Sequence, residues 1–186
     1  LGGIEWGFAS DGETVFASIS DALEKAPGDA GGMAAVRIAD GDVVWEAPPF
    51  QDTCGTRQGC HTAQPGAVTV IPGVVFSGSL DGHIRAYATG TGDVTATHER
   101  WRADGMGVGF SSPLVHDGRV YVIDNSANLF ALDASSGAVQ WEQSVGTVGK
   151  ASPVWADGKL FITETNGNVT ILQPGATGAT ELDHDE

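Results

Sequence analysis

The chain has 186 residues, of which 24 are acidic and 9 basic, and its formal net charge is −15 at pH 7. A surface this acidic repels phosphate, so we do not expect nucleic acid as a partner. Hydrophobic residues make up 41% of the chain and charged residues 18%, which is typical of a globular protein. No apolar run approaches the roughly 20 residues of a membrane-spanning helix, so we expect no membrane span.

Four related units follow one another with a period of about 40 residues, a spacing typical of repeat architectures. The clearest match joins the third and fourth units, where Asp117-Gly118 recurs as Asp157-Gly158 and Asn128 recurs as Asn168. The units are predicted at about residues 4–50, 66–101, 111–145 and 151–175.

The first unit is the loosest copy. Gly12 marks a turn in GFASDGETVFASISD, and Gly41 and Trp45 stand near the end of GGMAAVRIADGDVVWE. Between these segments lies SDALEKAPGD, the best helical stretch of the chain, which ends at Pro27. We expect it to belong to an insertion in the turn between the second and third strands.

The second unit reads AVTVIPGVVFSGSLDGHIRAYATGTGDV, with turns at Gly73, Asp81-Gly82 and Gly92. A longer loop, FQDTCGTRQGCHTAQPG, leads into it. In the third unit, strands are predicted at 112–116, 119–123, 128–133 and 138–143. The fourth unit repeats this pattern in ASPVWADGKLFITETNGNVTILQPGATG, and we expect the acidic tail ELDHDE to be solvated.

Both faces of these strands are partly apolar. In the third unit Val120 and Val122 lie on one face, and Tyr121 and Ile123 on the other. A sheet with two apolar faces packs between two other sheets, and four-stranded units of about 40–45 residues stacked in this way form a β-propeller. The predicted fold is therefore all-β: one partial β-propeller of about four antiparallel blades over residues 1–186.

The segment ALDASSGAVQW, which contains Asp133, Gly137 and Trp141, resembles the tryptophan-docking motif of the pyrroloquinoline-quinone (PQQ) repeat propellers. In that motif the indole inserts between neighbouring blades. Trp45 and Trp101 are the corresponding candidates in the first two units, where the motif is less complete. Propellers of this family have more blades, and the chain starts without an initiator methionine or a signal peptide, so we expect a fragment or a processed protein.

The two halves of the chain resemble different members of this family. Residues 1 to about 90 look like polyvinyl-alcohol-dehydrogenase-type quinoproteins, in segments such as GGIEWGFASDGETVF and PGAVTVIPGVVFSGSLDGHIRAY. Residues from about 98 onward look like generic PQQ-like repeat proteins, which often have no demonstrated catalysis.

Two functions follow from this resemblance. The first is part of a quinoprotein alcohol dehydrogenase, an oxidoreductase with PQQ and calcium as cofactors and a small alcohol or a polymer as substrate. The second is a non-catalytic scaffold for protein interaction or outer-membrane assembly, with protein partners. Both imply a periplasmic or extracytoplasmic location, and the sequence singles out no catalytic aspartate.

Both cysteines stand in CGTRQGCH, with Cys60 directly before His61. Covalent c-type haem needs two residues between the cysteines; here five separate Cys54 from Cys60, so we expect no covalent haem in this segment. Zinc needs about four ligands, and this loop offers three. The extracytoplasmic setting of the family favours a disulfide, and two unpaired thiols are the alternative.

In the related enzymes the cofactor lies on the face that carries the loops leading into each unit and the turns between second and third strands. On this face Glu5 is a candidate calcium ligand and Trp6 a candidate for stacking on the quinone. His83 and Lys150 are candidates for binding anionic groups of the cofactor. Each has a structural alternative: a solvated carboxylate, a packed indole, a turn histidine and a surface charge.

Overall fold

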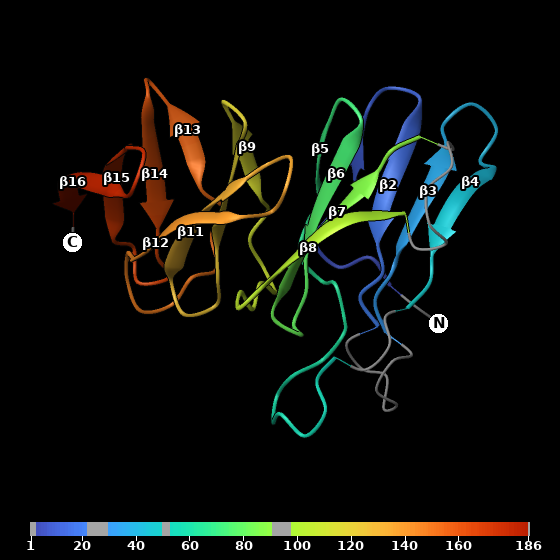
Figure 1. Cartoon of the computed structure of the whole chain (residues 1–186), viewed down its shortest axis with the longest axis horizontal. Helices are drawn as coiled ribbons and strands as arrows, with labels where there is room; N and C mark the ends of the chain where they lie inside the picture. Colours follow the sequence, from blue (N-terminus) through green and yellow to red (C-terminus); the bar gives the residue numbers. More distant parts are fainter. Residues whose placement is uncertain (1–2, 22–29, 50–52, 91–97, 186) are drawn as a thin grey trace. The chain divides into compact units, whose positions relative to one another are not determined.

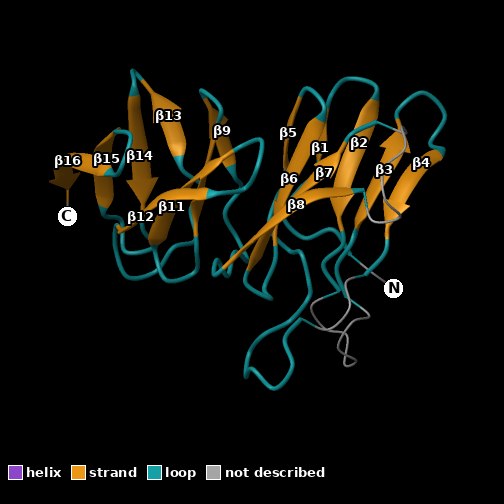
Figure 2. Cartoon of the chain, viewed as in Figure 1, coloured by secondary structure: helices purple, strands orange, loops and turns teal. Residues whose placement is uncertain are grey.

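The computed structural model describes residues 3–21, 30–49, 53–90 and 98–185. Sixteen strands lie in this part of the chain and form four antiparallel sheets of four strands each, in which consecutive strands are neighbours (Figure 1). Figure 2 shows strands and loops in these residues and no helix. The predicted all-β architecture of four-stranded units is confirmed. Within the same described ranges there is also no helix long and apolar enough to cross a membrane.

The first sheet contains β1 (Ala9–Ser10), β2 (Thr14–Ser18), β3 (Met33–Arg37) and β4 (Val43–Ala47). The second contains β5 (Thr69–Ile71), β6 (Val74–Gly78), β7 (His83–Ala88) and β8 (Glu99–Asp104). The third contains β9 (Leu114–His116), β10 (Arg119–Ile123), β11 (Asn128–Asp133) and β12 (Val139–Ser144). The fourth contains β13 (Val154–Ala156), β14 (Lys159–Thr163), β15 (Val169–Pro174) and β16 (Ala179–Asp185).

The chain divides into two compact units, Leu1–Gly109 with the first two sheets and Phe110–Glu186 with the last two. The stretch predicted as helical lies largely outside the described residues, and so does Gly92. The remaining predicted turns are formed by the residues that the sequence indicated. Asp117 and Gly118 have φ of 47° and 72°, and this pair of positive values is typical of the two-residue turn that joins antiparallel strands.

The last strand differs from the predicted limit of the fourth unit at residue 175. β16 pairs with β15 over its whole length, as far as Val169 opposite Asp185. Its side chains are almost all exposed. The acidic tail is thus solvated through its side chains while its backbone forms the outermost strand, because hydrogen bonding along a strand does not require apolar residues.

Each unit has its own core, built from the facing sides of its two sheets. In Leu1–Gly109, Phe16 and Trp45 of the first sheet pack with Tyr87 of the second. In Phe110–Glu186, Leu129 of the third sheet and Leu172 of the fourth belong to one cluster. Burial of each such apolar side chain stabilises the fold by about 1.5–3 kcal/mol.

Two tryptophans join neighbouring sheets through their indole N–H groups. Trp45 donates to the carbonyl of Thr89 at 3.1 Å, and Trp141 donates to the carbonyl of Gly175 at 3.3 Å. Each acceptor directly follows the third strand of the next sheet in the same unit. Trp101 is nearly buried and lies 5.7 Å from the ring of Phe76 in its own sheet, measured between ring centroids.

The turn before Trp141 is organised by Asp133 and Gly137. Oδ1 of Asp133 accepts hydrogen bonds from the backbone N–H groups of Ser135 and Ser136 at 3.0 and 2.9 Å, and from both hydroxyls. These bonds, above all those of the Ser135 and Ser136 hydroxyls, lower the pKa of Asp133. Gly137 has φ of 74°, a conformation that glycine adopts without strain. In the first sheet, Arg37 occupies the position of Asp133.

Candidate functional site

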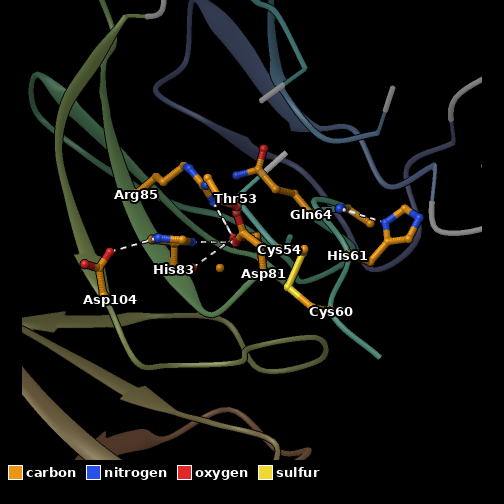
Figure 3. Close-up of polar contacts among 12 residues, drawn as sticks. Thr53, Cys54, Cys60, His61, Gln64, Asp81, His83, Arg85 and Asp104 are labelled. Atoms are coloured by element: carbon orange, nitrogen blue, oxygen red, sulfur yellow. Dashed lines mark hydrogen bonds and ion pairs between the residues drawn. A yellow bond between two sulfur atoms is a disulfide. The ribbon is translucent and has the colours of Figure 1, made fainter. Parts of the chain in front are cut away.

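The turn between β6 and β7 carries a group of charged and polar side chains that is largely buried (Figure 3). Its backbone follows a pattern shared with the third sheet. The N–H of Ser79 donates to the carbonyl of His83 at 3.0 Å, and the N–H of Asp124 donates to that of Asn128 at 3.0 Å. The repeat therefore determines the backbone of this turn, and the side chains make it distinct.

Asp81 and Arg85 form a fully buried ion pair. Nη2 of Arg85 lies 2.6 Å from Oδ2 of Asp81, and Nη1 lies 3.1 Å from Oδ1, so the guanidinium meets the carboxylate with two donors. The hydroxyl of Ser79 hydrogen-bonds to both partners, and a carboxylate oxygen of Glu99 lies 3.5 Å from Nε of Arg85. We call Ser79, Asp81, His83, Arg85 and Glu99 the Asp81 cluster.

His83 links the buried part of the cluster to an exposed carboxylate. Its Nδ1 lies 2.9 Å from Oδ1 of Asp81, and its Nε2 lies 2.9 Å from Oδ1 of Asp104, which is directly opposite on β8. The ring is nearly buried, whereas the Asp104 side chain is exposed.

Asp81 is held as a carboxylate. Burial opposes its ionisation, but hydrogen bonds from His83 and Arg85, the charge of Arg85 and the hydroxyl of Ser79 hold the pKa of Asp81 far below its usual range. A carboxylate this weakly basic is a poor proton acceptor at neutral pH. Asp81 therefore acts as the anionic partner of Arg85, and both of its carboxylate oxygens already accept hydrogen bonds, which does not suit it for general-base chemistry.

The loop before the second sheet contains the predicted disulfide between Cys54 and Cys60, whose Cα atoms are 5.5 Å apart. The loop is attached to the cluster at two points. Oγ1 of Thr53 donates to Oδ2 of Asp81 at 2.6 Å, and Nη2 of Arg57 donates to the carbonyls of Thr53 and Asp81 at 2.7 and 3.3 Å. With both sulfurs in the disulfide, the loop presents no thiolate to zinc or haem.

Gln64 fastens the segment after the disulfide to both sheets of its unit. Its buried amide Nε2 lies 3.0 Å from the hydroxyl of Ser77 and 3.2 Å from that of Tyr87, and its Oε1 accepts from the N–H of Gly32 at 3.0 Å. Burial raises the pKa of Tyr87, which keeps its hydroxyl neutral. The disulfide loop is therefore anchored on both sides.

The structure brings one of the four predicted cofactor residues, His83, into the cluster. Glu5 and Trp6 lie in the segment before β1, and both are exposed, Trp6 by 57%. Lys150 belongs to Phe110–Glu186, where its ammonium nitrogen lies 4.8 Å from the centroid of the Phe110 ring. Asp81 lies in a turn, as predicted, but the prediction did not include the ion pair that its carboxylate forms with Arg85.

The described residues do not fit a calcium–quinone site by themselves. In these ranges no group of three or more His, Cys, Asp or Glu side chains could hold a metal ion, whereas calcium takes about six to eight oxygen ligands. The Asp81 carboxylate is engaged by Arg85 and His83, and Arg85 is in turn neutralised by Asp81 and Glu99. Neither partner is available to a metal or to an anionic cofactor.

Sequence reasoning did not identify Arg57, Arg85 or Glu99. The signal for Arg85 was present, since it interrupts the apolar strand HIRAYA four residues after Asp81. A charged residue in a strand predicted to be buried needs a buried partner of opposite charge. Arg57 gave no such signal, because its role depends on contacts with backbone carbonyls.

Comparison with known proteins relates the chain to two groups. A polyvinylalcohol dehydrogenase from a Pseudomonas species is 41% identical over 133 residues, which are 66% of this chain and 21% of that protein. The outer membrane protein assembly factor BamB of Alkalilimnicola ehrlichii is 32% identical over 119 residues, which are 62% of this chain and 28% of that protein. The chain thus spans less than a third of the length of either relative.

Solved structures share the fold at low sequence identity. A quinohemoprotein alcohol dehydrogenase from Comamonas testosteroni superposes with a TM-score of 0.72 and 15% identity, over 99% of this chain and 35% of that one. BamB from Moraxella catarrhalis superposes with a TM-score of 0.67 and 18% identity, over 97% of this chain and 48% of that one. The family model described as outer membrane protein assembly factor BamB matches residues 2–181. The chain therefore belongs to this family of PQQ-like propellers, and it is related both to the quinoprotein dehydrogenases and to the BamB proteins.

Proposed function

We propose that the chain is part of a quinoprotein alcohol dehydrogenase, an oxidoreductase whose propeller binds PQQ and oxidises a small or polymeric alcohol. The observation that carries this proposal is the 41% identity to polyvinylalcohol dehydrogenase over 133 residues. The identity to the BamB protein of Alkalilimnicola ehrlichii is lower, at 32%. The disulfide loop and the Asp81 cluster distinguish the second sheet from the third.

An extracytoplasmic location accompanies this proposal. The Cys54–Cys60 disulfide supports it, because disulfides persist in oxidising compartments such as the periplasm. The names of the BamB relatives, which refer to the outer membrane, point the same way.

Within the proposed enzyme, Trp6 is the residue that we assign to the quinone ring. Its indole is 57% exposed and thus accessible for stacking. Glu5, next to it, is exposed as well, and a calcium role for Glu5 needs further oxygen ligands from outside the described residues. Lys150, in the other compact unit, is proposed separately as an exposed cation for a cofactor carboxylate. His83 stays a candidate for an anionic group of the cofactor; in the structure its ring contacts Asp81 and Asp104.

The test is an assay of the full-length protein that carries this chain. PQQ and calcium are added to the apoprotein, and dye reduction is followed with polyvinyl alcohol and with a small secondary alcohol. We expect turnover that requires both additions. Trp6→Ala should weaken PQQ binding by up to about tenfold, the value of an aromatic contact, whereas Phe8→Ala, in the same exposed segment, should not. Absence of both PQQ binding and turnover would exclude the dehydrogenase.

The second candidate function is a non-catalytic scaffold for outer-membrane assembly. It is favoured by the family model, which matches residues 2–181, and by the described residues, which do not form a calcium site. Its test is deletion of the gene in its host. Loss of outer-membrane proteins without loss of alcohol oxidation supports the scaffold, and the reverse result supports the enzyme.

A further inference from the structure

The disulfide loop encloses the Asp81 turn from two sides. Before Cys54, the hydroxyl of Thr53 donates to the Asp81 carboxylate at 2.6 Å. After Cys60, the carbonyl of Ala63 accepts from the N–H of Leu80, inside the same turn, at 3.0 Å. The disulfide thus connects the two segments that hold the turn.

Arg57 connects the disulfide loop with the Asp81 turn through hydrogen bonds. Its guanidinium donates to the carbonyls of Thr53 and Cys54 within the loop, at 2.7 and 3.3 Å, and to the carbonyl of Asp81 at 3.3 Å. A Cβ atom on Gly82 would lie 3.9 Å from this guanidinium, in ordinary van der Waals contact. Residues 55–59 are otherwise exposed, so the disulfide and Arg57 restrict a segment that has little burial of its own.

We propose that the Cys54–Cys60 disulfide is a redox-sensitive clamp on the Asp81 turn, with Arg57 as the residue that couples the two. Reduction by a dithiol breaks the S–S bond. Each cysteine sulfur gains one electron and one proton, and the dithiol leaves as a cyclic disulfide. The freed loop then loses its fixed contacts with Asp81, and water reaches the buried pair of Asp81 and Arg85. The clamp operates whether or not the protein binds a quinone.

The repeat supplies an internal control for this proposal. The amides of Ser79 and Gly82 donate within the clamped turn, to the carbonyls of His83 and Ser79. Their counterparts in the third sheet are the amides of Asp124 and Ala127, which donate to the carbonyls of Asn128 and Asp124. Both disulfide cysteines lie outside Phe110–Glu186, so exchange in this second turn reports on the stability of its own unit.

The experiment measures hydrogen exchange of these four amides by NMR in the oxidised chain and in dithiothreitol. We expect reduction to speed exchange in the clamped turn by at least about tenfold, the lower limit for the loss of one hydrogen bond to a charged group. Exchange in the control turn should stay unchanged. Unchanged exchange at Ser79 and Gly82 would overturn the proposal, and so would equal acceleration at Asp124 and Ala127.

Arg57→Gln tests the coupling with the disulfide intact. In this variant the amide of Gly82 should already exchange faster in the oxidised chain, and reduction should add less than it does in the wild type. Arg119→Gln, which changes a half-buried arginine of the other unit, is the matched control and should respond to reduction like the wild type. A full response to reduction in Arg57→Gln would exclude Arg57 as the coupling residue.

Discussion

Replacement of Asp81 by alanine is expected to destabilise Leu1–Gly109 strongly, because it leaves the Arg85 guanidinium charged and fully buried. The change removes contacts at 2.6 and 3.1 Å, and Glu99, at 3.5 Å from Nε, compensates in part. At an effective dielectric constant of about 20, unit charges about 3 Å apart attract by about 5 kcal/mol. Breaking a buried pair by removing one partner costs about 3–5 kcal/mol. Because Glu99 compensates in part, we expect a cost of about 3 kcal/mol.

The assay is urea denaturation, followed by tryptophan fluorescence, of the wild type, Asp81→Ala, Arg85→Met and the double variant. The double variant should be more stable than Asp81→Ala, because it removes the unpaired charge. The pKa of Asp81 in the folded state lies below its value in the unfolded chain. Its contribution to the free energy of unfolding is therefore present above about pH 4 and is lost as the pH falls further. In the Asp81→Ala variant, the free energy of unfolding should not show this decrease at low pH. A destabilisation below about 1 kcal/mol, or strict additivity of the two single changes, would refute the reasoning.

Three further predictions concern other parts of the chain. Gly149→Ala should destabilise Phe110–Glu186 in thermal unfolding, because its Cβ would lie 2.0 Å from the carbonyl oxygen of Asp124, whereas Gly178→Ala, with nothing within 4 Å, should not. Burial lowers the pKa of His98; stability should therefore be full above about pH 6.5 and decline as the pH falls below it. His98→Asn, which tolerates the positive φ, should remove that decline in denaturation curves measured at several pH values. Trp141→Ala should cost about 3–5 kcal/mol in urea denaturation, and a cost below about 1 kcal/mol would deny its role between sheets.

The fold could be predicted because the sequence pattern of one four-stranded sheet recurs along the chain. The recurrence of Asp117-Gly118 as Asp157-Gly158, with apolar residues on both strand faces, predicted four-stranded sheets, and the observed turns follow it. The strand β16 escaped prediction because its stability comes from backbone pairing with β15, while the acidic side chains carry no apolar pattern. A strand held in this way has no signature in composition.

The site was less predictable, because its contacts are specific to one sheet. The disulfide was expected from the family setting. His83 was singled out only as a candidate for cofactor binding, and its contact with Asp81 was not predicted. The pairing of Asp81 with Arg85 depends on the burial of β7, and the repeat pattern does not show which individual residues of that strand are buried. The contacts of Arg57 are with backbone carbonyls, whose positions depend on the folded loop.

Equilibrium binding of PQQ to the full-length protein in the presence of calcium tests the assignment to the dehydrogenases most directly. We predict one PQQ per polypeptide chain, bound tightly enough to survive gel filtration and able to support alcohol-dependent dye reduction. A full-length protein that is folded and retains its disulfide, yet leaves PQQ entirely in the free fraction, would contradict the assignment and leave the scaffold function.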